Sequence, residues 1–400
     1  MTLLERLLHG LLRSGAALSE VRVELPDGAG GPPALPRKLG EGLPLVWSER
    51  GAPPAQRLES VLREAAGEPL LALAADSVVD ARVIEHLIGT RGSFAFVAGE
   101  GAERGAALRL ECELRAGGAR DLLELAEAAL RSGRVEDFAK SGFDGYIADL
   151  RRELPPYLFR VSDAASRDRA EHFLFWSNYK GSTDFLTRYV YPPLVWRAVR
   201  PLARWRVHPN WVTAASWLGA FGAVPLFAAG AWLPGLALAY GMSVLDSVDG
   251  KLARLSFTYS KFGTFFDHGL DIIHPPIWYM AWGWCLGGGD PVSAPFRASL
   301  WLLGVYTVDR IVTGLFRSRT GRSVHGYTPL DEKLRTFLSR RNVNLAFFTV
   351  ALLVDGLLPG PGHPVASITF YAIVAWQVVC FLWHVERLVQ YWNPAAQRSS

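Results

Sequence analysis

The sequence predicts a multi-pass bundle of six membrane-spanning α-helices, preceded by a soluble α/β domain. Its 400 residues are 50% hydrophobic and include 14 Trp, 21 Phe and 12 Tyr, with a mean hydropathy of +0.14. This composition excludes a mainly disordered chain and disfavours a purely soluble one. Residues 1–170 carry 26 acidic and 22 basic side chains, whereas the rest of the chain carries 12 acidic and 20 basic ones. The basic residues flank apolar runs and form no continuous patch, so nucleic acid is not an expected partner.

Six apolar runs follow one another after residue 206, and one span needs about 20 apolar residues. The first two lie in Val207–Leu245, which has no Asp, Glu, Lys or Arg and is broken by Gly230 and by Pro234-Gly235. Buried helices of a soluble domain would explain a single run, but six in series favour a membrane bundle. The others are a run after Asp271 that ends at Gly287–Gly289, a run over Phe296–Phe316, and two runs within Val343–Tyr391 on either side of Pro359–Gly362.

Basic residues concentrate in the loops on one side of this bundle, while the opposite loops offer little beyond Arg297. The positive-inside rule therefore places that side and both termini in the cytoplasm, as expected in an inner (cytoplasmic) membrane. Met1–Arg13 is expected to be an amphipathic helix and not a secretory signal, because Glu5 and Arg6 interrupt its leucine stripe. The basic loop residues are Arg188, Arg197, Arg200, Arg204, Arg206, Arg254, Lys261, Arg317, Arg319, Arg322, Lys333, Arg335, Arg340 and Arg341.

The segment Thr187–Arg206 is too charged to span a membrane but is rich in Tyr, Trp, Leu and Val. An interfacial helix along the inner leaflet fits this composition, with an ordinary linker helix as the alternative. The expected organisation is a soluble domain over 1–170, a linker and interfacial helix over 171–206, a membrane domain over 207–392 and a tail over 393–400.

Residues 1–170 alternate short apolar runs with amphipathic stretches, which predicts an α/β sandwich with a mainly parallel sheet. Asp76 follows a predicted strand, where open α/β sheets hold ligands, but it can equally cap the next helix. The glycine-rich segment Asp27–Pro33 is interpreted as a surface loop, because its prolines remove amide donors that a phosphate cradle needs. The predicted strands are Val21–Leu25, Leu70–Ala74, Phe94–Ala98 and Leu108–Cys112, and the predicted helices are Arg57–Glu64, Ala81–Ile88 and Asp121–Leu130.

Four carboxylates cluster where the second and third spans meet one membrane face. Asp246 and Asp249 are three residues apart at the end of the second span, and Asp267 and Asp271 are four apart at the head of the third. Each spacing puts both carboxylates on one side of a helix, and the short connection makes the two helices antiparallel neighbours. Placing ionisable side chains at the ends of membrane spans costs free energy, so they indicate a functional site. The alternative is that these carboxylates only extend from the helix ends into water.

Four carboxylates in one place repel one another unless a cation neutralises them, and oxygen ligands favour Mg²⁺, Mn²⁺ or Ca²⁺ over zinc. Such a site suits a diphosphate substrate: Gly250 and Gly263 leave room for it, and Arg254 can pair with phosphate. A carboxylate not needed as a ligand can accept a proton from an attacking hydroxyl. The alternative from another class is an ion-coupled transporter, but the carboxylates lie at one face and no inverted repeat is visible.

The carboxylate cluster resembles a known family signature, D-x2-D-G-x2-A-R-x8-G-x3-D-x3-D, at every fixed position. The signature is that of the class I CDP-alcohol phosphatidyltransferases, and the resemblance covers roughly Asn178–Trp392. Pro209–Thr213 is similar to the Pro-Asn-x-(Val/Ile)-Thr stretch of the same family. The matching residues of the signature are Asp246, Asp249, Gly250, Ala253, Arg254, Gly263, Asp267 and Asp271.

The resemblance implies an integral-membrane enzyme that moves a phosphoryl-alcohol group from a CDP-linked donor to an acceptor hydroxyl and releases CMP, in phospholipid or polar-headgroup synthesis. It also implies membrane lipid as a partner and a homodimer. Mg²⁺ or Mn²⁺ would stabilise the transferring phosphate. The implied metal ligands are Asp246, Asp249, Asp267 and Asp271, with Asp271 also the general base, and the implied CDP contacts are Asn210, Thr213, Gly250, Ala253, Arg254 and Gly263.

The order of the two parts is similar to that of the di-myo-inositol phosphate phosphate synthases, in which a cytoplasmic nucleotidyltransferase domain precedes the membrane transferase. Their Lys-x-Thr-Asp-Gly junction corresponds to Lys180–Phe185, where the glycine is lost and one residue is added. Their Gly-x-Gly-x-Arg loop is absent, and only Leu71–Val79, with Asp76, resembles the strand that bears the metal aspartate. We therefore expect a degenerate, catalytically silent nucleotidyltransferase-like domain; a bifunctional enzyme that makes its CDP donor from CTP is the alternative.

Three arginines are candidates for binding an acceptor phosphate. Arg310 lies inside the fourth span, and Arg340 and Arg341 begin the fifth. Asp309 and Arg310 can equally form an internal salt bridge, and Arg340-Arg341 can be plain membrane anchors.

Overall fold

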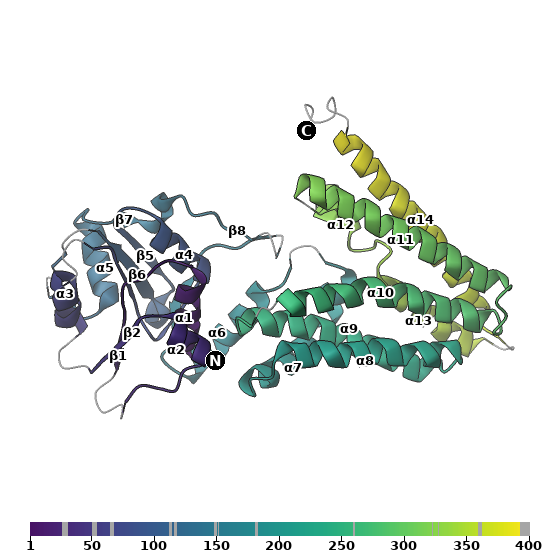
Figure 1. Ribbon diagram of the computed structural model, residues 1–400, viewed down its shortest axis with the longest axis horizontal. Helices are drawn as coiled ribbons and strands as arrows, with labels where there is room; N and C mark the ends of the chain where they lie inside the picture. Colours follow the sequence, from purple (N-terminus) through teal and green to yellow (C-terminus); the bar gives the residue numbers. More distant parts are fainter. Residues whose placement is uncertain are drawn as a thin grey trace. The chain divides into compact units, whose positions relative to one another are not determined.

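The computed structural model describes residues 1–392, except 26–30, 50–53, 65–67, 112–113, 116–117, 148–149, 151, 181–182, 259–260, 322, 327 and 359–361. Side chains at 49, 54–56, 58, 261–268, 270, 329 and 332 are also outside the description. The chain divides into two compact units (Figure 1). The first consists of residues 1–147 and 153–177, and the second of 148–152 and 178–400.

The first unit is a sheet covered by helices on both faces. Alternation along its strands produces this arrangement: Phe96 packs with α1 and α4, whereas its neighbour Ala95 packs with α3 and α5 (Figure 1). Its helices are α1 (Leu3–Arg13), α2 (Arg37–Gly42), α3 (Pro54–Glu64), α4 (Ala81–Gly89), α5 (Leu122–Arg131) and α6 (Ala164–Ser177), with 3₁₀ turns η1 (Gly101–Glu103) and η2 (Phe138–Ser141). Its strands are β1 (Val21–Leu25), β2 (Leu45–Glu49), β3 (Leu70–Leu73), β4 (Ser77–Val79), β5 (Phe94–Ala98), β6 (Gly105–Leu110), β7 (Glu136–Asp137), β8 (Tyr146–Ile147), β9 (Arg152–Glu153) and β10 (Leu158–Arg160).

The prediction of a mainly parallel sheet is wrong. The four-stranded sheet has the order β3-β6-β5-β7, in which β6 is antiparallel to both β3 and β5, while β7 is parallel to β5. The reason lies in the link between β5 and β6, where Gly99 and Gly101 have φ of +88° and +52°. These glycines turn the chain back within six residues, which is too short for a crossover helix. Only β1 and β2 form a separate parallel pair.

Asp76 does not cap the next helix, and its role at a ligand site stays a prediction. Its carboxylate accepts hydrogen bonds from Arg160 Nε at 3.0 Å and Nη2 at 2.7 Å. The helix cap is instead Asp80, which accepts from the backbone N–H of Arg82 at 3.0 Å. The predicted loop Asp27–Pro33 lies partly outside the described residues.

The second unit is a helical bundle whose six long helices share one apolar core. Trp278 and Trp282 of α10 are fully buried there, and the Trp282 ring stacks on Phe348 of α13 at 4.1 Å. Within the bundle, α8 packs on α9 and α10, and α11 packs on α10 and α14 (Figure 1). The elements are η3 (a π-helical turn, Leu186–Val190), α7 (Pro192–Arg204), α8 (Pro209–Ala228), α9 (Trp232–Leu255), α10 (Lys261–Leu286), α11 (Ala294–Thr320), η4 (Val324–Gly326), α12 (Pro329–Leu334), α13 (Arg341–Leu357) and α14 (Pro364–Trp392).

Three helices in the described part of the chain are long and apolar enough to cross a membrane: α8, α11 and α14. The other long helices are shorter or more polar. α13 has 17 residues, and α9 ends in a segment that carries Asp246, Asp249, Lys251 and Arg254. These three helices are candidate membrane spans, and the number six remains a prediction.

Candidate functional site

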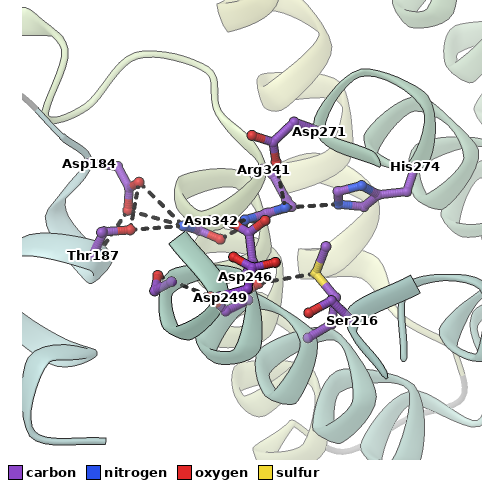
Figure 2. Close-up of polar contacts among 12 residues, drawn as sticks. Asp184, Thr187, Ser216, Asp246, Asp249, Asp271, His274, Arg341 and Asn342 are labelled. Atoms are coloured by element: carbon purple, nitrogen blue, oxygen red, sulfur yellow. Dashed lines mark hydrogen bonds and ion pairs between the residues drawn. The ribbon is translucent and has the colours of Figure 1, made fainter. Parts of the chain in front are cut away.

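The last turns of α9 carry the first carboxylate pair. Asp249 is only 3% exposed, and its Oδ2 accepts a hydrogen bond from Thr213 Oγ1 on α8 at 2.7 Å. Asp246, one turn earlier, keeps 16% of its side chain exposed. The α8–α9 packing therefore fixes one carboxylate with a neutral donor and leaves the other facing the space near α10 and α13 (Figure 2).

Arg341 joins the carboxylates of two helices. From the first position of α13, its Nη2 donates to Asp246 Oδ2 at 2.8 Å and its Nη1 donates to Asp271 Oδ1 on α10 at 3.0 Å (Figure 2). The Nε2 atom of His274 lies 3.2 Å from the same Nη1. Asp271 is 55% exposed, so it is the most accessible carboxylate of the three whose side chains are described.

The site thus brings together two of the four predicted carboxylates, Asp246 and Asp271, through Arg341, while Asp249 lies one turn further along α9 and bonds Thr213. Gly263 lies in the first turn of α10 and Asp267 in the second. Both belong to the stretch of α10 for which the structure describes the backbone but not the side chains. Among the described side chains, no group of three or more His, Cys, Asp or Glu residues gathers closely enough to hold a metal ion.

The donor set nevertheless fits a hard cation. Asp246 and Asp271 approach closely enough for one guanidinium to bond both, so a positive charge already sits between them. Carboxylates would bind a metal through oxygen atoms, and oxygen atoms are the ligands that Mg²⁺ and Mn²⁺ prefer. Neutralisation by an internal arginine meets the same electrostatic need that a cation would meet.

The residues expected around a nucleotide lie beside this cluster. Gly250 and Arg254 are one turn apart on α9, and a Cβ on Gly250 would lie 3.4 Å from Arg254 Nη1. The guanidinium therefore folds back over the glycine. Ala253 precedes Arg254 on the same helix, and Asn210 lies in the first turn of α8, where its N–H donates to His208 Nδ1 at 3.2 Å.

Arg310 lies near the cluster but makes no salt bridge with Asp309. Its guanidinium stacks 4.7 Å from the centre of the Tyr306 ring, and the Tyr306 hydroxyl donates to the Asp271 carbonyl at 3.2 Å. Asp309 points to α14 instead, where it accepts from His384 Nδ1 at 2.6 Å and from Gln377 Nε2 at 3.2 Å. The internal salt bridge suggested by the sequence is therefore wrong. Arg340 precedes Arg341 and caps α13 by its backbone alone.

Two residues of the site were missed by sequence reasoning. His274 contacts Arg341, and Asn342 accepts from Arg341 Nε at 3.2 Å. Asn342 follows Arg341 directly, but a polar residue after a pair of arginines carries no recognisable signal. His274 lies three residues after Asp271, a spacing that places both on one helix face and could have indicated it.

Comparison with known proteins agrees with the carboxylate signature. Residues 206–383 match the sequence model of the CDP-alcohol phosphatidyltransferase family. No curated protein matches the chain's sequence.

Two crystal structures of phosphatidylinositol phosphate synthase from Mycobacterium tuberculosis are similar to the chain. The structure with CDP-DAG bound is 18% identical, with a TM-score of 0.39, and covers 50% of this chain and 93% of that one. The structure in complex with manganese and citrate is 19% identical, with a TM-score of 0.40, and covers 50% of this chain and 90% of that one. On the match of residues 206–383 to the CDP-alcohol phosphatidyltransferase model and on the signature, this chain is a phosphotransferase that is similar to that family.

Proposed function

We propose that the chain transfers a phosphoryl-alcohol group, either phosphatidyl or polyol phosphate, from a CDP-linked donor to an acceptor hydroxyl and releases CMP. The observation that carries this proposal is that Arg341 binds Asp246 of α9 and Asp271 of α10 together, with Asp249 one turn from Asp246 on α9. The products belong to phospholipid or polar-headgroup synthesis. The reaction takes place at the cytoplasmic face of an inner membrane, in a bundle of six spans that works as a homodimer.

Mg²⁺ or Mn²⁺ would be held by Asp246, Asp249, Asp267 and Asp271. A bound divalent cation supplies neutralisation and polarisation of the diphosphate that is cleaved. Thr213 holds Asp249 by its hydroxyl, so we assign it to orienting this carboxylate as well as to facing the nucleotide. Gly250, Ala253, Arg254, Gly263 and Asn210 complete the CDP pocket.

Asp271 is proposed as the general base, because it is more exposed than Asp246 and Asp249 and lies where an acceptor can reach it. The acceptor oxygen forms a bond to the phosphorus of the transferred group while the bond from that phosphorus to the CMP oxygen breaks. Asp271 takes the hydroxyl proton, and CMP leaves with the electron pair.

The acceptor is proposed to carry negative charge. Arg310 stacks on Tyr306, which bonds the backbone of Asp271, and Arg340 adjoins Arg341. One guanidinium bonded to the proposed base, with two further arginines on neighbouring residues, favours an acceptor that bears a phosphate.

The test incubates the purified chain in lipid nanodiscs with Mg²⁺ or Mn²⁺, CDP-diacylglycerol or CDP-inositol, and a panel of polyols with and without a phosphate group. We expect CMP and a phosphodiester product in equal amounts by mass spectrometry, and neither of them after EDTA. Absence of CMP with every donor would contradict the proposal. Cation uptake into liposomes without CMP production would favour the transporter instead.

A further inference from the structure

We infer that Asp184 is a positioning residue of this site, which acts through Asn342 to hold Arg341 between Asp246 and Asp271. The inference rests on the proposed function. Asn342 Nδ2 donates to the Asp184 carboxylate at 3.3 and 3.4 Å, while Asn342 Oδ1 accepts from Arg341 Nε at 3.2 Å (Figure 2). The contacts thus run without a gap from the segment before η3 to the carboxylates of α9 and α10.

Asp184 is itself held firmly. It is 5% exposed and accepts from the Thr187 backbone N–H at 3.1 Å and from the Thr187 hydroxyl at 2.9 Å. Burial of a carboxylate is unfavourable unless hydrogen bonds replace those it makes to water, and the bonds from Thr187 do so here. The carboxylate therefore provides a fixed point outside the long helices.

The amide of Asn342 is chemically suited to link the two ends. Its oxygen accepts from a guanidinium and its nitrogen donates to a carboxylate, so one side chain meets both demands. Asn342 is 5% exposed and also donates to Thr187 Oγ1 at 3.2 Å. An aspartate in its place would accept from Arg341 but would repel Asp184.

Asp184 and Asn342 are proposed to fix the position of the Arg341 guanidinium. Its Nε, Nη1 and Nη2 atoms are each bonded, to Asn342, Asp271 and Asp246 respectively. A free arginine side chain loses rotamer entropy when it is fixed, so holding it in advance spares that loss when an anionic acceptor binds. Loss of Asp184 loosens the hold of Asn342 on Arg341 Nε and weakens acceptor binding more than donor binding.

The experiment compares Asp184→Asn and Asn342→Leu with the matched control Asn344→Leu. Asn344 is also a buried amide of α13, but its partners are Tyr279 and Ser339. In full-length protein we expect the acceptor KM to rise about 10-fold in the first two variants, with the CDP-donor KM within twofold of wild type. Asn342→Gln, which keeps the amide, should restore part of the lost acceptor affinity.

A double-variant cycle with Arg341→Ala separates positioning from general destabilisation. If Asp184 acts through Arg341, Asp184→Asn adds no further KM change to Arg341→Ala, and the double variant melts close to Arg341→Ala alone. Additive effects on both measurements, or an Asn344→Leu profile equal to that of Asn342→Leu, would overturn the inference. The melting cycle needs no turnover, so it decides the inference even where the wild type releases no CMP and the proposed function fails.

Discussion

Arg341 donates a hydrogen bond to Asp246 at 2.8 Å, which joins the first residue of α13 to the last turns of α9. The same guanidinium bonds Asp271 of α10, so a single side chain neutralises carboxylates from two helices. Without this charge, the carboxylates would repel one another at a site that is mostly withdrawn from water. Arg341 therefore serves the stability of the metal-free protein as well as the proposed reaction.

Removal of Arg341 is expected to make the protein respond more strongly to a cation. Arg341→Ala leaves two carboxylates uncompensated, and we expect a loss of about 1–3 kcal/mol in the free energy of unfolding without metal. Added Mn²⁺ should then raise the melting temperature of Arg341→Ala more than that of wild type, because it replaces the missing charge. Thermal unfolding in detergent measures both. The control is Arg297→Ala in an exposed part of the α11 N-terminus, and equal Mn²⁺ responses in all three proteins would contradict the expectation.

The hydroxyl of Thr213 is expected to matter for activity through Asp249. Thr213→Val keeps the side-chain shape but removes the 2.7 Å donor to the buried carboxylate. Loss of a group that orients a metal ligand typically costs about 10–100-fold, and we expect CMP release to fall by that factor. Ser216→Ala is the matched control, since Ser216 is buried one turn later on α8 but bonds only its own helix, at Val212 O. The interpretation of Thr213 fails if both variants release CMP at the same rate.

The carboxylate cluster could be predicted because its members are close in sequence. Asp246 and Asp249 are spaced for one helix face, and the short connection to α10 brings Asp271 near them. Their counter-charge could not be predicted, because Arg341 is 95 residues from Asp246 and only the packing of α13 brings it there. Asp76 shows the same limit, since its partner Arg160 is 84 residues away.

In the first unit, strand positions were easier to predict than strand directions. β1 and β5 begin and end where the apolar runs of the sequence place them. Short apolar runs of this kind are a local property of the sequence. Direction depends on the links, and the six residues after β5 reverse the chain, so that β6 is antiparallel to β5 and not parallel as expected.

Acid is expected to destabilise the second unit through His325. Burial, followed by the positive charges of its neighbours, holds the pKa of His325 well below its ordinary 6.5. The folded protein keeps this ring neutral while the unfolded chain protonates it, so stability is lost as pH falls below about 6.5 toward the folded-state pKa. The neighbouring groups are Arg340, Arg335, His384 and Arg310.

The melting temperature measured between pH 8 and pH 5 checks this dependence. His325→Gln should flatten the decline, because its amide does not titrate. His172→Gln, which changes an exposed histidine of α6, should leave the decline as it is. A wild-type melting temperature that does not fall between pH 7 and pH 5 would contradict the assignment.

The first unit is expected to be catalytically silent. Asp76, the carboxylate at the end of β3, is engaged by both Nε and Nη2 of Arg160. The sequence also lacks the Gly-x-Gly-x-Arg loop that holds the nucleotide triphosphate in nucleotidyltransferase domains. The full-length chain with CTP, Mg²⁺ and a panel of polyol phosphates should release no pyrophosphate. CTP-dependent pyrophosphate release would instead support the bifunctional enzyme.

The most direct test of the central claim is the rate of CMP release by Asp249→Asn. Asparagine keeps the volume of the side chain and can still accept from Thr213, but it removes the charge on which a cation depends. We expect CMP release from a CDP-linked donor below about 1% of the wild-type rate, while Asp290→Asn, a carboxylate change in the exposed α10–α11 loop, stays near wild type. Wild-type turnover in Asp249→Asn would show that the acidic residues of α9 and α10 are not the seat of the reaction.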